Sequence, residues 1–246
     1  MIFNTSQDDI IIDIPQQYTK IGIKASGGLD STILSYMLAL YKRDERPDID
    51  LIPITLIEST KPFQFMYSSM SLQKISELTG ITFGTHYFNM VHTHLIAEGQ
   101  DDLLKLVYIN KIIDCHCLGV TLNPPVNAFP NQEGADPARV QLPNGEKYPV
   151  VEIGKNTANF QPLANIDKKG ICELYESLGV LDVLFPRTHS CEMIHGKYSL
   201  QLNLSKHCGQ DDCWWCQERL WGFGRLEMKV SDTIRHRIKE ALDRIF

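Results

Sequence analysis

The sequence predicts an α/β protein with a Rossmann-like parallel sheet and helices on both faces, followed by a small cysteine-rich module. Short apolar runs of strand length alternate with segments of helical periodicity through most of the chain. A glycine-rich segment at residues 26–32 joins one such strand to a helix, and four of the seven cysteines fall between Cys191 and Cys216. We expect an α/β domain over residues 1–185, with the module and a final helix packed on it over residues 186–246.

The first elements form a strand–helix–strand unit around the glycine-rich segment. Strands are expected at residues 10–12 and 18–24, the second of which runs into that segment. Residues 31–42 have helical spacing, with apolar side chains at Ile33, Leu34, Met37, Leu38 and Tyr41. The nearly continuous apolar run at residues 51–57 is typical of a buried parallel strand.

The alternation continues into the second half of the chain. We expect a helix over residues 65–79 ended by Gly80, a strand over 82–90, a helix over 101–115, a strand over 119–122 and a helix over 168–178. From residue 18 onwards, each pair of successive strands is separated by a helix, which is the pattern of parallel crossover connections.

Two segments depart from this alternation. Residues 123–161 are rich in Asn, Pro and Gly, with a hairpin turn expected at Asn144-Gly145, and a loop of this length is usually functional or mobile. Residues 231–246 predict a last helix whose apolar side chains share one face, namely Ile234, Ile238, Leu242 and Ile245. That exposed apolar face suits a homodimer contact.

Composition restricts the partners and the compartment. A chain of 246 residues with 43% hydrophobic residues can bury one sizeable core. Its formal net charge of -6 provides no global basic field, which argues against nucleic acid as a partner. No apolar run is long enough to span a bilayer, and residues 1–9 lack the pattern of a signal peptide. We therefore expect a cytoplasmic protein without a membrane partner.

The glycine-rich segment reads Ser26-Gly27-Gly28-Leu29-Asp30-Ser31-Thr32 and is called here the glycine loop. Two glycines allow backbone N–H groups to face a phosphate without obstruction, and the following helix adds the positive end of its dipole. The three hydroxyl side chains add donors, and the Asp30 carboxylate suits Mg²⁺. No Gly-Lys-Ser/Thr sequence follows, so this is not a Walker loop. The competing interpretation is an ordinary Gly-Gly turn with Asp30 as the helix cap.

The late cysteines predict a metal site. Cys191, Cys208, Cys213 and Cys216 supply four thiolates, the last two in a C-x2-C arrangement. Four thiolates around one ion form a closed structural zinc site. An iron–sulfur cluster and unrelated buried thiols are the alternatives.

The remaining cysteines carry weaker signals. Cys115 falls on the apolar stripe of the helix expected at 101–115, which favours core packing. Cys117 beside His116 is a candidate second metal or sulfur site, and Cys172 is expected to be half-buried.

The glycine loop matches the SGGxDS signature of the PP-loop ATP pyrophosphatases, whose fold is the adenine nucleotide alpha hydrolase-like one. The order of later motifs resembles the 7-cyano-7-deazaguanine synthase family in particular. Those motifs are Pro162-Leu163, Lys168-Lys169, Ser190-Cys191, Cys208-Gly209, Cys213, Cys216 and Arg219.

The chain departs from that family pattern in three places. Sixteen residues separate Cys191 from Cys208, and four separate Cys208 from Cys213, both more than in the family. The family's Gly-Val-Asn-x-x-Asp segment, associated with the substrate base, is replaced by the residues from Gly119 to Pro125. This last difference concerns substrate identity most directly.

The resemblance implies an ATP-dependent carbon–nitrogen ligase with ATP, Mg²⁺ and Zn²⁺ as cofactors. A carboxylate on a 7-deazaguanine would be adenylated with release of pyrophosphate, and ammonia would then give an amide and, with a second ATP, a nitrile. The glycine loop would hold the pyrophosphate and Asp30 the Mg²⁺. Lys168 or its neighbour would neutralise phosphate charge, Arg187 would meet a carboxylate or phosphate, and Asn123 would contact the substrate.

Two other functions fit the sequence. The first is a PP-loop sulfurtransferase of the tRNA thiolation type, using an iron–sulfur cluster or a persulfide. Cys115 and Cys117 favour it, whereas the acidic balance and the Ser190-Cys191 pair count against it. The second is a nucleotide-binding regulatory module without turnover.

Overall fold

The computed structural model describes residues 1–59, 63–92, 96–129, 151–152, 158–191 and 213–226. Its centre is a six-stranded sheet in the order β5-β4-β3-β6-β8-β7. The parallel strands are β3 (Lys20–Lys24), β4 (Asp50–Glu58), β5 (Tyr87–Val91), β6 (Cys115–Cys117) and β8 (Ala158–Phe160). Strand β7 (Val151–Glu152) pairs antiparallel with β8 at the edge.

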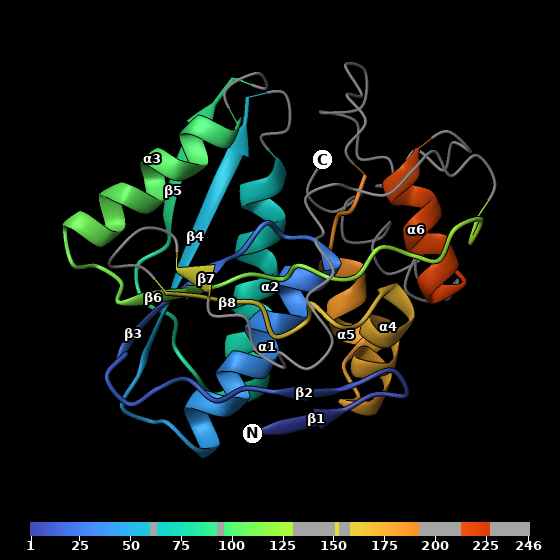
Figure 1. Ribbon diagram of the computed structural model, residues 1–246, viewed down its shortest axis with the longest axis horizontal. Coiled ribbons are helices and arrows are strands. Elements are labelled where there is room, and N and C mark those ends of the chain that lie inside the picture. The colour runs from blue at the N-terminus through green and yellow to red at the C-terminus, as the bar shows by residue number, and fades with distance from the viewer. Residues whose placement is uncertain (60–62, 93–95, 130–150, 153–157, 192–212, 227–246) are drawn as a thin grey trace, which may run out of the picture.

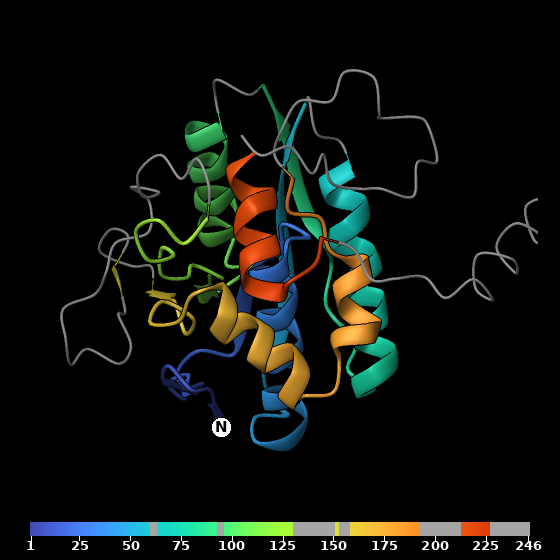
Figure 2. The ribbon, with the colours of Figure 1, turned by 90° about the vertical axis from the view of Figure 1, so that its right-hand side faces the viewer.

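Helices cover both faces of this sheet, which confirms the predicted α/β class. They are α1 (Leu29–Asp44), α2 (Phe63–Thr79), α3 (Ile96–Ile109), α4 (Lys168–Ser177), α5 (Leu181–Leu184) and α6 (Trp214–Phe223), with a 3-10 turn at Phe185–Arg187. Figure 1 shows α3 on one side of β4 and β5 and α1 with α2 on the other. In Figure 2, α6 (red) stands above α4 (gold).

The two faces have separate cores. Ile33, Leu34 and Leu38 of α1 are fully buried against Ile21 and Ile23 of β3, in a core that also includes α4. On the opposite face, Ile52 and Ile54 of β4 meet the apolar side of α3 at Leu103, Leu104 and Val107. Strand β3 therefore lies in the middle of the sheet with its apolar side chains buried, and it positions the start of the loop that follows it.

Taken in chain order, the parallel strands are arranged 3-2-1-4-5. The order reverses between β3 and β6, so the connections after these two strands leave towards opposite sides of the sheet. Ligands of open α/β sheets bind in the crevice that forms at this point, outside the carboxyl ends of the strands. The glycine loop follows β3 directly, and residues 118–121 follow β6. Both segments thus meet at the expected ligand crevice.

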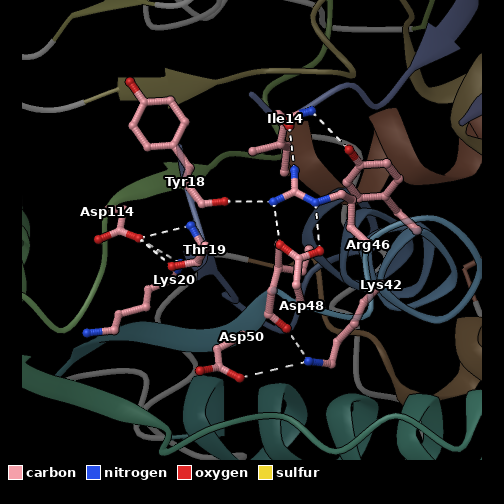
Figure 3. A network of polar contacts seen from close by, with 11 residues as sticks. Ile14, Tyr18, Thr19, Lys20, Lys42, Arg46, Asp48, Asp50 and Asp114 are labelled. Atoms are coloured by element: carbon pink, nitrogen blue, oxygen red, sulfur yellow. Dashed lines mark hydrogen bonds and ion pairs between the residues drawn. The ribbon is translucent and has the colours of Figure 1, made fainter. Parts of the chain in front are cut away.

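The amino ends of the central strands β3 and β6 are held by a polar network (Figure 3). The Asp114 carboxylate accepts hydrogen bonds from the backbone N–H groups of Thr19 and Lys20, both 2.9 Å long. Arg46 is buried and donates to the carbonyl of Ile14 at 2.8 Å and to Asp48. These contacts tie the start of β3 to β6 and to the end of α1.

An N-terminal hairpin fixes the start of α4. Strands β1 (Ile2–Asn4) and β2 (Asp9–Ile11) pair antiparallel, and their connecting turn reaches α4. The Ser6 N–H and hydroxyl both donate to Glu173 at 2.6 Å. Gln7 exchanges hydrogen bonds of 2.7 and 2.9 Å with Asp167, the residue that caps α4. This arrangement sets the position of the next residue, Lys168.

Several predicted boundaries were wrong. The helix expected at 101–115 is α3, which ends at Ile109, because Lys111 adopts a left-handed φ of 54°. Cys115 therefore lies on β6, and the strand expected at 119–122 is an irregular segment. The strand expected at 82–90 begins only at Tyr87. Residues 158–160 form β8 although they belong to the predicted long loop.

Some predictions fall outside the described residues. They are the hairpin turn at Asn144-Gly145, the final helix over 231–246 and the position of Cys208. Within the described part of the chain, every helix is too short or too polar to cross a bilayer.

Candidate nucleotide and metal site

The glycine loop has a backbone shape that only glycine fits at its centre. Gly27 has a φ of +79°, and a Cβ there would lie 2.7 Å from the backbone nitrogen of Ser68 on α2. Before it, the Ala25 N–H donates to the Ile54 carbonyl at 2.9 Å. The Thr55 hydroxyl on β4 also donates to the carbonyl of Ala25. The loop is thus wedged between β4 and α2.

Hydroxyl groups gather where the loop enters α1. The Oγ atoms of Ser26 and Ser31 are 3.0 Å apart, and the Gly28 N–H donates to Ser26 at 3.3 Å. Gly28 is the cap residue of α1, so the free N–H groups of the helix's first turn follow directly. An anion in front of this turn would meet both the positive end of the helix dipole and hydroxyl donors. The N–H groups and hydroxyls at this end of α1 are thus available to an anion, and phosphate binding there stays a prediction.

Asp30 lies in the first turn of α1 with one oxygen engaged and one unsatisfied. Its Oδ2 accepts a hydrogen bond from the ammonium of Lys168, while its Oδ1 is buried without a hydrogen-bond partner. Thr32 Oγ1 is likewise buried and unpartnered. Buried oxygens without partners are unusual in native proteins, and carboxylate and hydroxyl oxygens are ligands that Mg²⁺ prefers. The unsatisfied Oδ1 of Asp30 fits the predicted magnesium ion, whereas Thr32, two residues further along the helix, faces a different side of α1.

Lys168 is the first residue of α4 and is only 5% exposed. Besides Asp30, its ammonium lies 3.7 Å from Glu218 of α6 and 3.5 Å from the Thr121 hydroxyl. One buried cation therefore lies between two carboxylates from different helices. Removing either carboxylate would leave a buried charge with less compensation, which is costly.

Three cysteines come together at the start of α6. The sulfur atoms of Cys191, Cys213 and Cys216 all lie within 4.8 Å of one another, and all three residues are buried. The Cys191 and Cys213 sulfurs are 3.9 Å apart. Thiolates bound to one tetrahedral zinc ion at about 2.3 Å are separated by about 3.8 Å. The three residues, called here the cysteine cluster, thus have the spacing of a metal site.

Arg219 and His189 connect the cysteine cluster to the glycine loop. Arg219 is fully buried and donates to the hydroxyls of Thr188 at 2.9 Å and Ser190 at 3.1 Å. The His189 N–H donates to the Gly27 carbonyl at 2.9 Å, and its ring stacks on Tyr67 with centroids 5.0 Å apart. The chain just before Cys191 is therefore fixed against the loop.

Arg187, the other predicted cationic site residue, lies apart from Lys168. The guanidinium of Arg187 donates to the Val183 carbonyl and makes no hydrogen bond or ion pair with the glycine loop among the described residues. The charge of Arg187 acts instead on Glu77, whose pKa is lowered mainly by the hydrogen bond from Lys74 and to a smaller extent by Arg187.

Asn123 is half-buried and follows Leu122, whose N–H donates to the Ile166 carbonyl at 2.8 Å. It lies two residues after Thr121, whose hydroxyl is 3.5 Å from the Lys168 ammonium.

The central Cys-His-Cys strand is part of the core. Cys115 and Cys117 pair with Ile21 and Ile23 and share their face, whereas His116 points to the opposite face. The alternation rules out a joint site for Cys117 and His116. Burial raises the pKa of Cys117 to about 12, so the free thiol stays protonated and a poor nucleophile.

Sequence reasoning missed Glu218. It is a buried carboxylate two residues beyond Cys216, and no motif marks it. The only sequence signal is its position on the helix that starts at the C-x2-C pair, about half a helical turn beyond Cys216. Its partner Lys168 is recognisable, but the pairing depends on how α6 packs against α4.

No protein-family model matches the sequence, and no curated protein matches it. Among solved structures, the chain is similar to the U34-tRNA thiolase NcsA from Methanococcus maripaludis with its [4Fe-4S] cluster. The two chains are 17% identical with a TM-score of 0.43, over 66% of this chain and 58% of the thiolase. The match thus spans less than two thirds of the thiolase's length.

Proposed function

We propose that this protein is an ATP-using ligase of the PP-loop kind, which adenylates a carboxylate and then aminates it. The observation that carries the proposal is the contact between Asp30 and Lys168, which are 138 residues apart in the sequence. It joins the two halves of the signature, the early glycine loop and the late lysine. Both lie at the reversal point of the sheet, where such folds bind ligands.

The first step places charge where the site can compensate it. A carboxylate oxygen of the substrate attacks the α-phosphorus of ATP, and the bond from that phosphorus to the bridging oxygen breaks to release pyrophosphate. The N–H groups of the glycine loop and the hydroxyls of Ser26 and Ser31 bind the departing phosphates. The Lys168 ammonium neutralises the negative charge that grows on the phosphates. Asp30 would hold Mg²⁺, which would supply further charge compensation when bound.

The second step forms the carbon–nitrogen bond. Ammonia attacks the acyl carbon, AMP leaves, and the nitrogen loses a proton to give the amide. A second ATP extends the sequence: the amide oxygen attacks the α-phosphorus and pyrophosphate leaves, and the adenylated amide then loses AMP and its N–H protons to give a nitrile.

A 7-carboxy-7-deazaguanine is our proposed substrate, and the segment after β6 is the proposed contact. Gly119 packs against the first turn of α1, where a Cβ would lie 2.9 Å from the Ser31 nitrogen. Thr121 then approaches the Lys168 ammonium at 3.5 Å. A substrate beside this segment would present its carboxylate to the α-phosphate. Asn123, two residues on, is the candidate hydrogen-bonding partner of the base.

Zinc is our proposed occupant of the cysteine cluster, with Cys208 as the fourth ligand. The spacing of the three described sulfurs supports a single ion, since a four-iron cluster holds each thiolate on a different iron and therefore farther apart. All three cysteines are buried, which suits a closed structural site. Zinc would stabilise the short helix α6 against α4.

The test is turnover by the purified protein with Mg-ATP, ammonium and 7-carboxy-7-deazaguanine, with product mass measured in parallel. We expect pyrophosphate release and a product lighter than the acid by the change to an amide or nitrile. Asp30→Ala should abolish both. Release without a new carbon–nitrogen bond, or transfer of sulfur to RNA by a brown iron-containing protein, would contradict the proposal.

A further inference from the structure

Two separate chains of contacts run from the cysteine cluster to the glycine loop. The first passes through the residues preceding Cys191, since the His189 N–H bonds the Gly27 carbonyl at 2.9 Å. Arg219 of α6 holds this segment through Ser190 at 3.1 Å. The first contact chain therefore reaches the glycine loop through its backbone.

The second contact chain is made of charged side chains. Helix α6 begins immediately after Cys213 and contains Cys216, so ligation at these residues would fix its amino end. Glu218, in the next turn and 1% exposed, lies 3.7 Å from the Lys168 ammonium. Lys168 in turn contacts Asp30.

The packing between α6 and α4 leaves little room for adjustment. A Cβ on Gly222 would lie 2.5 Å from Cβ of Lys168 and 2.9 Å from its carbonyl oxygen. The backbone of α6 therefore touches the backbone that carries Lys168. A displacement of α6 would change the distance between Glu218 and the ammonium directly.

Occupation of the loop requires an exchange of partners at Lys168. Cation binding at Asp30 would compete with the ammonium for the same carboxylate, and phosphate oxygens would attract the ammonium into the crevice. A buried ammonium that gives up one carboxylate depends on the remaining one for compensation. Glu218 is that remaining carboxylate.

We propose that Glu218 is a positioning residue that couples metal binding at the cysteine cluster to nucleotide binding at the glycine loop. With metal bound, the amino end of α6 is fixed and Glu218 holds the ammonium where phosphate can meet it. Without metal, the amino end of α6 loses one of its anchors, and Glu218 is held less firmly beside the ammonium. The inference rests on the proposed nucleotide site but not on the identity of the substrate. Because coupling is reciprocal, nucleotide must also tighten metal binding by the same factor.

The experiment measures zinc affinity of the full chain in competition with a chromophoric chelator. It is done with and without an ATP analogue that carries a methylene bridge between the α- and β-phosphates. We expect the analogue to increase the zinc affinity of the wild type by about 5-fold or more. In Glu218→Gln this ratio should fall close to 1 while one zinc still binds. Glu176→Gln removes the same charge from an exposed position on α4 and should keep the wild-type ratio.

The outcomes separate this inference from the ligase proposal. A wild-type ratio of 1, or an unchanged ratio in Glu218→Gln, would overturn the coupling even if the protein forms amides. Absence of analogue binding to the zinc-loaded wild type would overturn both. If Glu218→Gln does not fold with zinc, Glu218→Asp decides, because its shorter side chain keeps the charge and must lower the ratio.

Discussion

The ammonium of Lys168, at the start of α4, contacts the carboxylate of Asp30, in the first turn of α1. The pair lies beside the segments that follow β3 and β6, and Lys168 is almost inaccessible to solvent. Asp30 and Lys168 are 138 residues apart in the sequence, so the pair forms only when the whole sheet is assembled. A ligand of the glycine loop must rearrange this pair.

Lys168→Met is expected to lower the kcat of pyrophosphate release strongly, by more than a change in the free energy of unfolding would explain. Loss of a positioned charge at a phosphoryl-transfer site typically costs about 100-fold or more in kcat. Lys169→Met is the control, since Lys169 is exposed and its ammonium lies over the Trp221 ring at 4.8 Å. It should retain activity within a few-fold. Equal losses in the two variants, measured by steady-state kinetics, would remove Lys168 from the site.

Gly27→Ala is expected to abolish nucleotide binding and to lower the free energy of unfolding by about 2–4 kcal/mol. The cost has two parts, a left-handed φ of +79° and a clash with the Ser68 nitrogen. Gly80→Ala isolates the first part, because Gly80 has a φ of +74° with no atom within 4 Å of the added Cβ. It should cost about 1 kcal/mol and leave binding intact. Denaturant unfolding and calorimetric titration measure both effects.

Arg46→Met should destabilise the fold without changing the site. Arg46 is buried and hydrogen-bonds the carbonyls of Ile14 and Tyr18, which lose their partners in the variant (Figure 3). We expect a loss of about 2–4 kcal/mol in the free energy of unfolding. Arg43→Met removes an exposed pair with Asp44 and should change stability by less than about 1 kcal/mol. Similar values for the two variants would contradict the structural role of the network.

Stability should fall as the pH drops below about 6.5. Burial, with a smaller effect from Lys24, lowers the pKa of His116 to about 3, and burial lowers that of His86 to about 4. Between about pH 3 and 6.5 the unfolded chain therefore binds more protons at His116 than the folded one, so stability rises with pH in this window.

Replacing His116 isolates its part of that pH dependence. His116→Gln should reduce the slope of unfolding free energy against pH by about 1.4 kcal/mol per pH unit between pH 4 and 6. Urea unfolding of both proteins at several pH values gives the two slopes. Parallel slopes would show that His116 titrates normally in the folded protein.

Local patterns were sufficient to predict the elements that surround β3. The apolar periodicity predicts α1 and the buried strand β4, and Gly27 with Gly28 marks the turn between β3 and α1. Lys168 was predicted from a resemblance, and the structure brings it to Asp30. The proximity of Cys191, Cys213 and Cys216 is also as expected, and the fourth ligand, Cys208, stays a prediction.

The features that were missed depend on long-range contacts. The apolar stripe of α3 continues in phase to Ile112 and Cys115, so periodicity alone does not reveal that Lys111 ends the helical path. Strand β8 is short and becomes a strand by pairing with β6. Glu218 has no meaning in the sequence until α6 packs on α4 and brings it to Lys168. Local sequence patterns do not encode these long-range contacts.

The most direct test of the central claim follows the oxygen atoms of the substrate carboxylate. Turnover of 7-carboxy-7-deazaguanine labelled with ¹⁸O in its carboxylate, with Mg-ATP and ammonium, is analysed by mass spectrometry of the AMP formed. Attack of the carboxylate on the α-phosphorus predicts AMP that carries one ¹⁸O and pyrophosphate that carries none. Unlabelled AMP, or label in pyrophosphate or phosphate, would contradict adenylation of the carboxylate at this site.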